Sequence, residues 1–88
     1  MATQNQTADN ETWINIVSTL SLVVGTEYTI QNVSSDVALL SEKSTIPVDG
    51  SPFHKLNPGE YQSVTPETGL GLWVKGKLSG ITIAVTET

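Results

Sequence analysis

The chain has 88 residues, a formal net charge of −5 and a pI of about 4.4, and it contains neither cysteine nor arginine. These values exclude a disulfide framework and a cysteine zinc site, and they also exclude the basic stripe with which a protein neutralises nucleic-acid phosphates. A chain this short buries only about 60–65% of the surface that its unfolded form exposes. With disulfides excluded and a single histidine, oligomerisation is the remaining way to complete a marginal core, and we expect a homo-oligomer.

The first ten residues (MATQNQTADN) are polar and show no apolar periodicity, which predicts a flexible N-terminal arm over residues 1–10 and a single domain over residues 11–88. This stretch has no basic start and no apolar run, so we expect no signal peptide. No stretch of the chain approaches the length of a membrane-spanning helix.

Residues 11–24 (ETWINIVSTLSLVV) fit two patterns. Alternation places Ile14, Ile16 and Leu20 on one face of a strand, whereas a helical stripe runs through Trp13, Ile16 and Leu20. The β-branched Thr, Ile and Val residues lose side-chain freedom in a helix and suit a pleated surface. We therefore predict a strand here.

The remainder reads as short Thr-, Val- and Ile-rich strands separated by turn residues. The predicted strands are Glu27–Val33, Val37–Glu42, Phe53–Leu56, Tyr61–Thr65, Leu70–Val74 and Ile81–Thr86. We expect the first two of these to form one hairpin and the last two to form another. Residues 43–52 form the longest irregular connection, and Asn57-Pro58-Gly59-Glu60 has the chemistry of a type II turn.

About seven short strands without room for helical crossovers predict an all-β fold, either a small antiparallel β-sandwich or a barrel. Catalysis is not expected, because a serine nucleophile needs a base and His54 is the single histidine. Alternation points His54 away from Phe53, toward solvent or an interface. The carboxylates are scattered without paired spacing, so we predict no catalytic residue, no metal site and no cofactor.

The tryptophans are the candidate interface residues, together with Lys75 and His54. If Leu70, Leu72 and Val74 face the core, Trp73 and Lys75 point outward, provided that no bulge changes the register. An outward Trp on so small a domain suits an interface anchor, whereas burial between two layers is the alternative. The two interpretations are balanced for Trp73, and burial is favoured for Trp13.

Several phrases together resemble small all-β virion proteins of tailed bacteriophages. They are Tyr28–Asn32 (YTIQN), Leu56–Glu60 (LNPGE), Leu70–Gly76 (LGLWVKG) and Ile81–Glu87 (ITIAVTE). The resemblance covers most of the chain after Gly25 and implies a non-enzymatic structural protein. Such proteins commonly decorate the capsid exterior as trimers, or serve as tail and fibre components.

The resemblance implies a capsid decoration (cement) protein, favoured as a trimer, on the outer face of the major capsid protein lattice after assembly in a bacterial cytoplasm. An acidic surface suits the exterior of a capsid better than its DNA-filled interior. We expect neither nucleic acid nor membrane as a partner. The alternatives are a tail or fibre module of the virion and a carbohydrate-binding module that stacks Trp73 and Trp13 on sugar rings.

Overall fold

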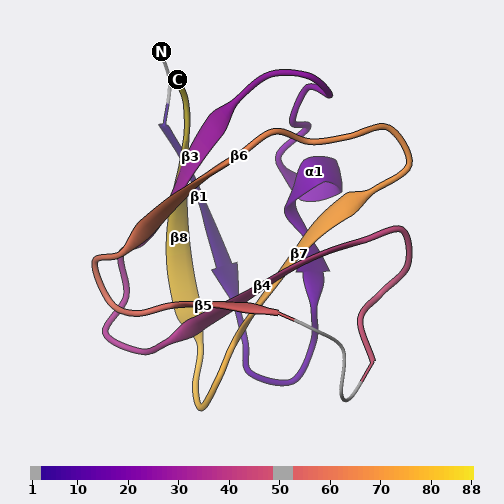
Figure 1. The fold of residues 1–88 in the computed structure, drawn as a ribbon. Helices are drawn as coiled ribbons and strands as arrows, with labels where there is room; N and C mark the ends of the chain where they lie inside the picture. Colours follow the sequence, from indigo (N-terminus) through magenta and orange to yellow (C-terminus); the bar gives the residue numbers. More distant parts are fainter. Residues whose placement is uncertain (1–2, 49–52) are drawn as a thin grey trace.

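Two four-stranded antiparallel sheets face each other in the computed structural model, which describes residues 3–48 and 53–88 (Figure 1). Sheet A has the order β1-β8-β3-β6, and sheet B has the order β2-β7-β4-β5. The strands of sheet A are β1 (Thr3–Ala8), β8 (Ile81–Glu87), β3 (Tyr28–Asn32) and β6 (Tyr61–Val64). The strands of sheet B are β2 (Ile14–Asn15), β7 (Gly71–Gly76), β4 (Ala38–Lys43) and β5 (His54–Leu56). The predicted all-β sandwich is confirmed.

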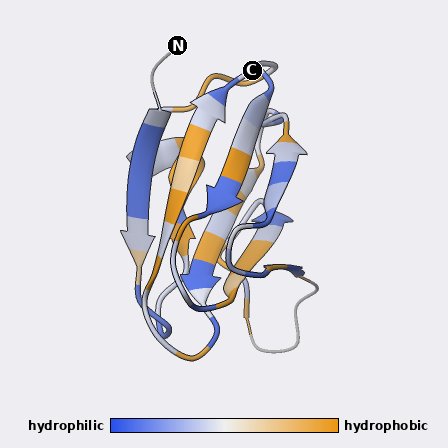
Figure 2. Cartoon of the chain, turned by 90° about the vertical axis from the view of Figure 1, so that its left-hand side faces the viewer, coloured by the Kyte–Doolittle hydropathy of each residue, from blue (hydrophilic) through white to orange (hydrophobic). Residues whose placement is uncertain are grey.

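The core lies between the sheets and follows the alternation of the strands. In β8, Ile81, Ile83 and Val85 are buried, and the residues between them are partly exposed. The facing strand β7 buries Leu72 and Val74 in the same core. Figure 2 shows this alternation as apolar bands along the strands. The predicted inward face of β8 is therefore confirmed. In the other segment Leu72 and Val74 face the core as expected, whereas Leu70 lies before β7 and is half-buried outside the core cluster.

The flexible arm predicted over residues 1–10 is wrong for residues 3–8, which belong to sheet A. They form β1, which pairs with β8 in a continuous antiparallel register from Thr3 opposite Thr86 to Ala8 opposite Ile81. Figure 2 shows β1, the strand after the N-terminus, as a hydrophilic strand at the sheet edge. Main-chain hydrogen bonds to β8 need no apolar side chains, which is why hydropathy gave no sign of this strand.

The strand predicted over residues 11–24 is wrong for most of its length. The segment forms the two-residue strand β2 and then a single helical turn, α1 (Ile16–Thr19). Asn15 is the N-cap, and its Oδ1 accepts a hydrogen bond from the Val17 amide at 3.1 Å. The turn buries Ile16 completely and packs against β7 (Figure 1). A capped turn that places one isoleucine in the core outweighs the strand preference of its residues.

Both predicted hairpins are wrong because their strands lie in different sheets. β3 belongs to sheet A and β4 to sheet B, and β7 belongs to sheet B and β8 to sheet A. Among the described strands, only β4 and β5 are both consecutive in the chain and neighbours in a sheet. The turn at Asn57–Glu60 is confirmed, because Gly59 has φ +85° and the Glu60 amide donates to the Asn57 carbonyl at 2.9 Å.

Asp36 joins two of the loops that cross between the sheets. Its carboxylate accepts hydrogen bonds from the Val37 amide at 2.8 Å and from the Ser79 amide and hydroxyl, both at 2.7 Å. These bonds lower the pKa of Asp36, with the Ser79 hydroxyl as the largest cause and the Val37 amide next. The connection from β3 to β4 is thereby fixed to the connection from β7 to β8.

The lowered pKa of Asp36 predicts a loss of stability in acid. A carboxyl group whose pKa is lower in the folded state stabilises the fold fully above its unfolded pKa of about 3.9. This stabilisation is lost as the pH falls through the lower folded value. We expect Asp36→Asn to reduce the thermal midpoint at neutral pH and to flatten its decline below about pH 4. Parallel declines of the wild type and the variant in thermal melts across that range would contradict this assignment.

Candidate interaction surface

The outer face of sheet B brings together residues from four strands. Because Leu72 and Val74 face the core, Trp73 and Lys75 point outward from β7. The register places Asn15 and Ser41 on either side of Trp73, and Leu39 beside Lys75. Lys55 of β5 lies on the other side of Leu39. We call this surface the aromatic–lysine face, and it consists of Trp13, Leu39, Ser41, Lys43, Lys55, Trp73 and Lys75.

The indole of Trp73 is held in place by its neighbours. Its Nε1 donates a hydrogen bond to the Lys43 carbonyl at 3.0 Å. A Cβ at Gly71 would lie 2.8 Å from both Trp73 Nε1 and Asn15 Nδ2, so a larger residue there would displace the indole or the Asn15 amide. Trp73 is half-buried, and its ring is therefore a fixed part of the surface rather than a mobile side chain.

Trp13 lies on the same face, just before β2. The Lys75 ammonium lies 5.1 Å from the centroid of the Trp13 ring, within the range of a cation–π interaction. Trp13 is half-buried and does not belong to the core cluster between the sheets. The register of β2 agrees with this position. Ile14 pairs with Val74, so Trp13, the residue before Ile14, lies opposite Lys75.

The aromatic–lysine face differs in charge from the whole chain. It holds three of the four lysines of a chain whose net charge is −5. Glu42, also on β4, pairs with Leu72 and so belongs to the opposite side of the sheet. Asp9 lies shortly before Trp13 in the chain. Its pKa is lowered mainly by hydrogen bonds from the Glu11 and Thr12 amides, and Lys75 makes a smaller contribution. The face thus offers aromatic surface and positive charge together.

Leu39 is an apolar member of this face. It is only 7% exposed, yet it lies outside the core cluster and pairs with the two lysines Lys55 and Lys75. Long lysine side chains commonly cover apolar surface with their methylene stems while the charged ends remain in water. A partner that displaces those stems would meet an apolar residue flanked by two ammonium groups.

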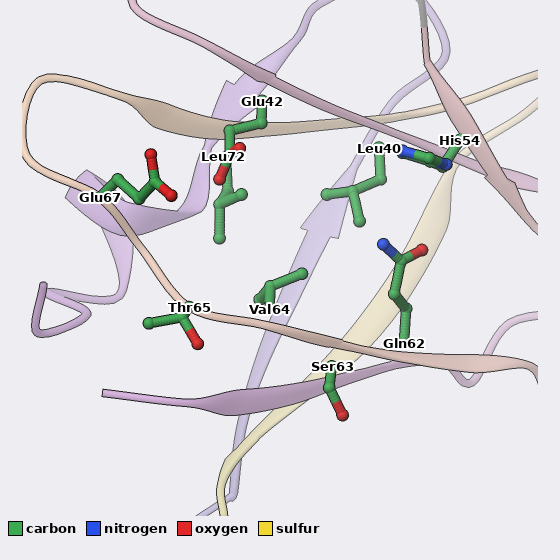
Figure 3. Close-up of a pocket in the computed structure, with 9 residues that line it drawn as sticks. All are labelled: Leu40, Glu42, His54, Gln62, Ser63, Val64, Thr65, Glu67 and Leu72. Carbon is green, nitrogen blue, oxygen red and sulfur yellow. The ribbon is translucent and has the colours of Figure 1, made fainter. Parts of the chain in front are cut away.

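His54 does not belong to this face. It pairs with Leu40 at the edge of sheet B, and its exposed side chain lines a cavity of about 320 Å³ between β5 and β6. Figure 3 shows Glu42 and Glu67 on one side of this cavity and His54 with Gln62 on the other, while the Ser63 side chain points away. Leu40, Val64 and Leu72 lie between these polar groups. The sequence analysis expected His54 to point toward solvent or an interface, whereas its pairing with the core residue Leu40 places it on the inner side of sheet B, where it remains exposed at the edge.

The cavity is an open seam rather than a built reaction site. Its apolar lining consists of the core residues Leu40 and Leu72 and of the half-buried Val64. Within residues 3–48 and 53–88, no group of three or more His, Asp or Glu side chains is arranged to hold a metal ion.

The structure therefore separates the four predicted interface residues. Trp73, Lys75 and Trp13 lie together, whereas His54 lines the seam. The sequence analysis missed Leu39, Ser41, Lys43 and Lys55, which complete the aromatic–lysine face. For the three residues of β4, the sequence does contain a pattern, because Leu39, Ser41 and Lys43 alternate along the strand and so share one face. This pattern places them beside Trp73 and Lys75 only when the pairing of β4 with β7 is also known.

A comparison of the chain with known protein families, with curated proteins and with solved structures found no match. The described part of the chain contains no helix that is long and apolar enough to cross a membrane.

Proposed function

We propose that this protein is a non-enzymatic virion structural protein of a tailed bacteriophage, a capsid decoration protein that binds the outer capsid surface as an oligomer, with a trimer favoured. The observation that supports it best is the aromatic–lysine face, where Trp13, Trp73 and three lysines lie on one side of an otherwise acidic domain. The four sequence segments that resemble small virion proteins of tailed bacteriophages support the same proposal.

The composition of this face suits docking on a larger protein shell. Tryptophan is enriched among the residues that dominate binding energy at interfaces. Lysines at the rim of such a contact attract an acidic partner and raise the rate of encounter. A subunit that binds weakly through one face is retained when several linked copies bind a repetitive lattice at once. In this proposal, the major capsid protein presents a complementary acidic surface.

A co-sedimentation experiment tests the proposal directly. Purified protein is mixed with undecorated heads of tailed phages, the heads are pelleted, and bound protein is measured. We expect saturable binding by the wild type and at least a tenfold weaker affinity for the double variant Lys43→Glu/Lys75→Glu. Absence of wild-type binding to every head tested would exclude the decoration function.

The matched control for this experiment is Lys77→Glu combined with Ser18→Asp. Lys77 is exposed and follows the end of β7, Ser18 is exposed on α1, and neither is a member of the aromatic–lysine face. The control makes the chain more acidic by nearly as much without changing the face. We expect it to bind close to the wild-type level, so equal losses in both variants would indicate a general charge effect instead of docking through this face.

The tail or fibre module remains the nearest alternative within the same virion. Immunogold labelling of intact particles separates the two, because label on heads agrees with decoration and label confined to tails agrees with the alternative.

A carbohydrate-binding module is the second candidate, and two half-buried tryptophans on one sheet face favour it. Lysine stacking on Trp13 covers part of that ring, which leaves Trp73 as the main platform. On a glycan array we then expect binding that Trp73→Ala abolishes. An array without binding by the wild type would count against this candidate.

A further inference from the structure

β1 presents an open main-chain edge. It is the terminal strand of sheet A and pairs with β8 along one side, from Thr3 to Ala8. No described strand lies on its other side. On this side the Thr7 carbonyl accepts a hydrogen bond from Gln6 Nε2 at 2.8 Å, which an added strand would have to displace. The other main-chain groups that point away from β8 are available to another extended segment.

The other edges of the two sheets are shorter or better protected. β2 has two residues and continues directly into α1, and β5 has three residues that include His54 and Lys55. β6 has four residues and is followed two positions later by Pro66. β1 has six residues and contains no charged side chain and no proline. Charges, prolines and short length are the usual protection of an edge against pairing, and β1 has none of them.

The outer face of sheet A beside β1 is also uncharged. The strand register aligns one row of hydroxyl residues across all four strands, namely Thr3, Thr86, Thr29 and Ser63. The next outward row consists of Asn5, Ala84, Gln31 and Tyr61. Two copies with a net charge of −5 repel each other, and this repulsion is weakest where neither copy places charge at the contact.

We propose that β1 pairs with β1 of a second copy in antiparallel orientation, so that the two A sheets form one continuous sheet. A two-fold axis perpendicular to the sheet requires paired residues to lie on the same face. A register centred on Asn5 meets this condition, and it places Thr3 opposite Thr7 and Gln4 opposite Gln6 of the other copy. Hydroxyl and amide side chains both donate and accept hydrogen bonds, so each of these pairs is self-complementary.

The contact is small, because it consists of one strand and the side chains beside it. Stable complexes bury about 800 Å² on each partner, and a single strand pair buries less. We therefore expect a dimer that forms at high micromolar concentration in solution. The β1 contact does not depend on the proposed function. If the protein also forms a trimer or binds a capsid, those contacts would use other surfaces, and pairing of β1 would then link one such assembly to the next.

Cysteine cross-linking tests the contact and its register. The chain contains no cysteine, so a single introduced thiol can form a disulfide only with another copy. Residues opposite each other in an antiparallel pair have Cα atoms about 4.5 to 5.5 Å apart, which suits a disulfide. We expect Asn5→Cys to give a covalent dimer under mild oxidation at least tenfold faster than Thr68→Cys, whose thiol lies at an exposed position outside the strands. Equal rates for the two variants would overturn the proposed contact.

Added charge gives a second measurement that does not depend on oxidation. Asn5→Lys/Thr7→Lys places two like charges on β1 of each copy, and Ser18→Lys/Thr19→Lys adds the same charge at exposed positions of α1. Both variants lower the net negative charge, so general repulsion falls equally in both. In sedimentation equilibrium we expect the β1 variant to be monomeric and the α1 variant to dimerise like the wild type. A monomeric wild type at millimolar concentration, or a trimer that neither variant changes, would exclude the β1 contact while leaving the proposed function to its own test.

Discussion

Replacing Asn32 with alanine is expected to lower the free energy of unfolding by about 3 to 5 kcal/mol. Asn32 is completely buried, and its Nδ2 donates to the Asp36 carbonyl at 2.7 Å and to the Leu56 carbonyl at 2.8 Å. Its Oδ1 accepts from the amide and the hydroxyl of Ser34. Alanine leaves these partners without the side chain that satisfies them, and each unsatisfied buried polar group costs about 1 to 3 kcal/mol.

Gln31→Ala is the matched control for this measurement. Gln31 is the preceding residue of β3, and its exposed side chain donates a single hydrogen bond to the Gly59 carbonyl at 3.2 Å. We expect a change below about 1 kcal/mol in urea unfolding followed by tryptophan fluorescence. Similar losses in the two variants would show that the network around Asn32 has no special stabilising role.

Asn32→Asp sharpens the same test through pH. At neutral pH the variant places a buried carboxylate against the carbonyls of Asp36 and Leu56, which both repel it. Protonation in acid restores one donor, so burial raises the pKa of this carboxyl and the variant gains stability relative to wild type as the pH falls. The wild type instead loses stability in acid because of the lowered pKa of Asp36. Both proteins keep Asp36, so they differ at pH values above the range in which Asp36 is protonated: there thermal melts should show the variant gaining stability as the pH falls while the wild type stays unchanged.

The inward faces of the strands were predictable because they depend on local alternation. Ile81, Ile83 and Val85 alternate with smaller or polar residues. On a strand with one buried face, such a pattern allows only the orientation in which these three residues face the core. The turn at Asn57–Glu60 was predictable for a similar reason, since proline sets φ at its second position and glycine permits the positive φ at its third.

The pairing of the strands was not predictable from the same residues. A short polar connection has the same chemistry whether the chain returns within one sheet or crosses to the facing sheet. At the crossing from β3 to β4, the buried Asn32 side chain bonds the crossing loop and the end of β5. That contact joins residues 24 positions apart and leaves no local pattern in the sequence.

The candidate surface shows the same limit. Trp73 and Lys75 could be assigned to the outer side of β7 from alternation alone. Their grouping with Lys43 and Lys55 depends on β4 lying between β7 and β5, which is a property of the sheet order. Edge strand β1 was missed because its residues are polar and its stability comes from main-chain pairing with β8.

Gly76→Ala is expected to destabilise the fold by about 3 kcal/mol or more. A Cβ at this position would lie far inside van der Waals contact of the Ser79 carbonyl oxygen and 2.9 Å from the Ser79 carbonyl carbon. Both atoms belong to the main chain, so no side-chain rotation can relieve the overlap. The connection from β7 to β8 must move, although it is fixed by hydrogen bonds from Lys77 to the Val37 carbonyl and from Ser79 to Asp36.

The same substitution at Gly80 provides the control, because it lies in the same connection. A Cβ there would meet nothing closer than the Ala8 carbonyl oxygen at 3.4 Å, which is close to ordinary contact. We expect Gly80→Ala to change stability by less than about 1 kcal/mol in the same urea titration. Gly76 does not have the positive φ of Gly25, Gly59 and Gly69, so the expected difference between the two alanine variants comes from the close approach of Ser79 and not from backbone conformation. Equal stability of the two variants would mean that the connection between β7 and β8 can rearrange freely. It would contradict our interpretation that hydrogen bonds hold this connection in place.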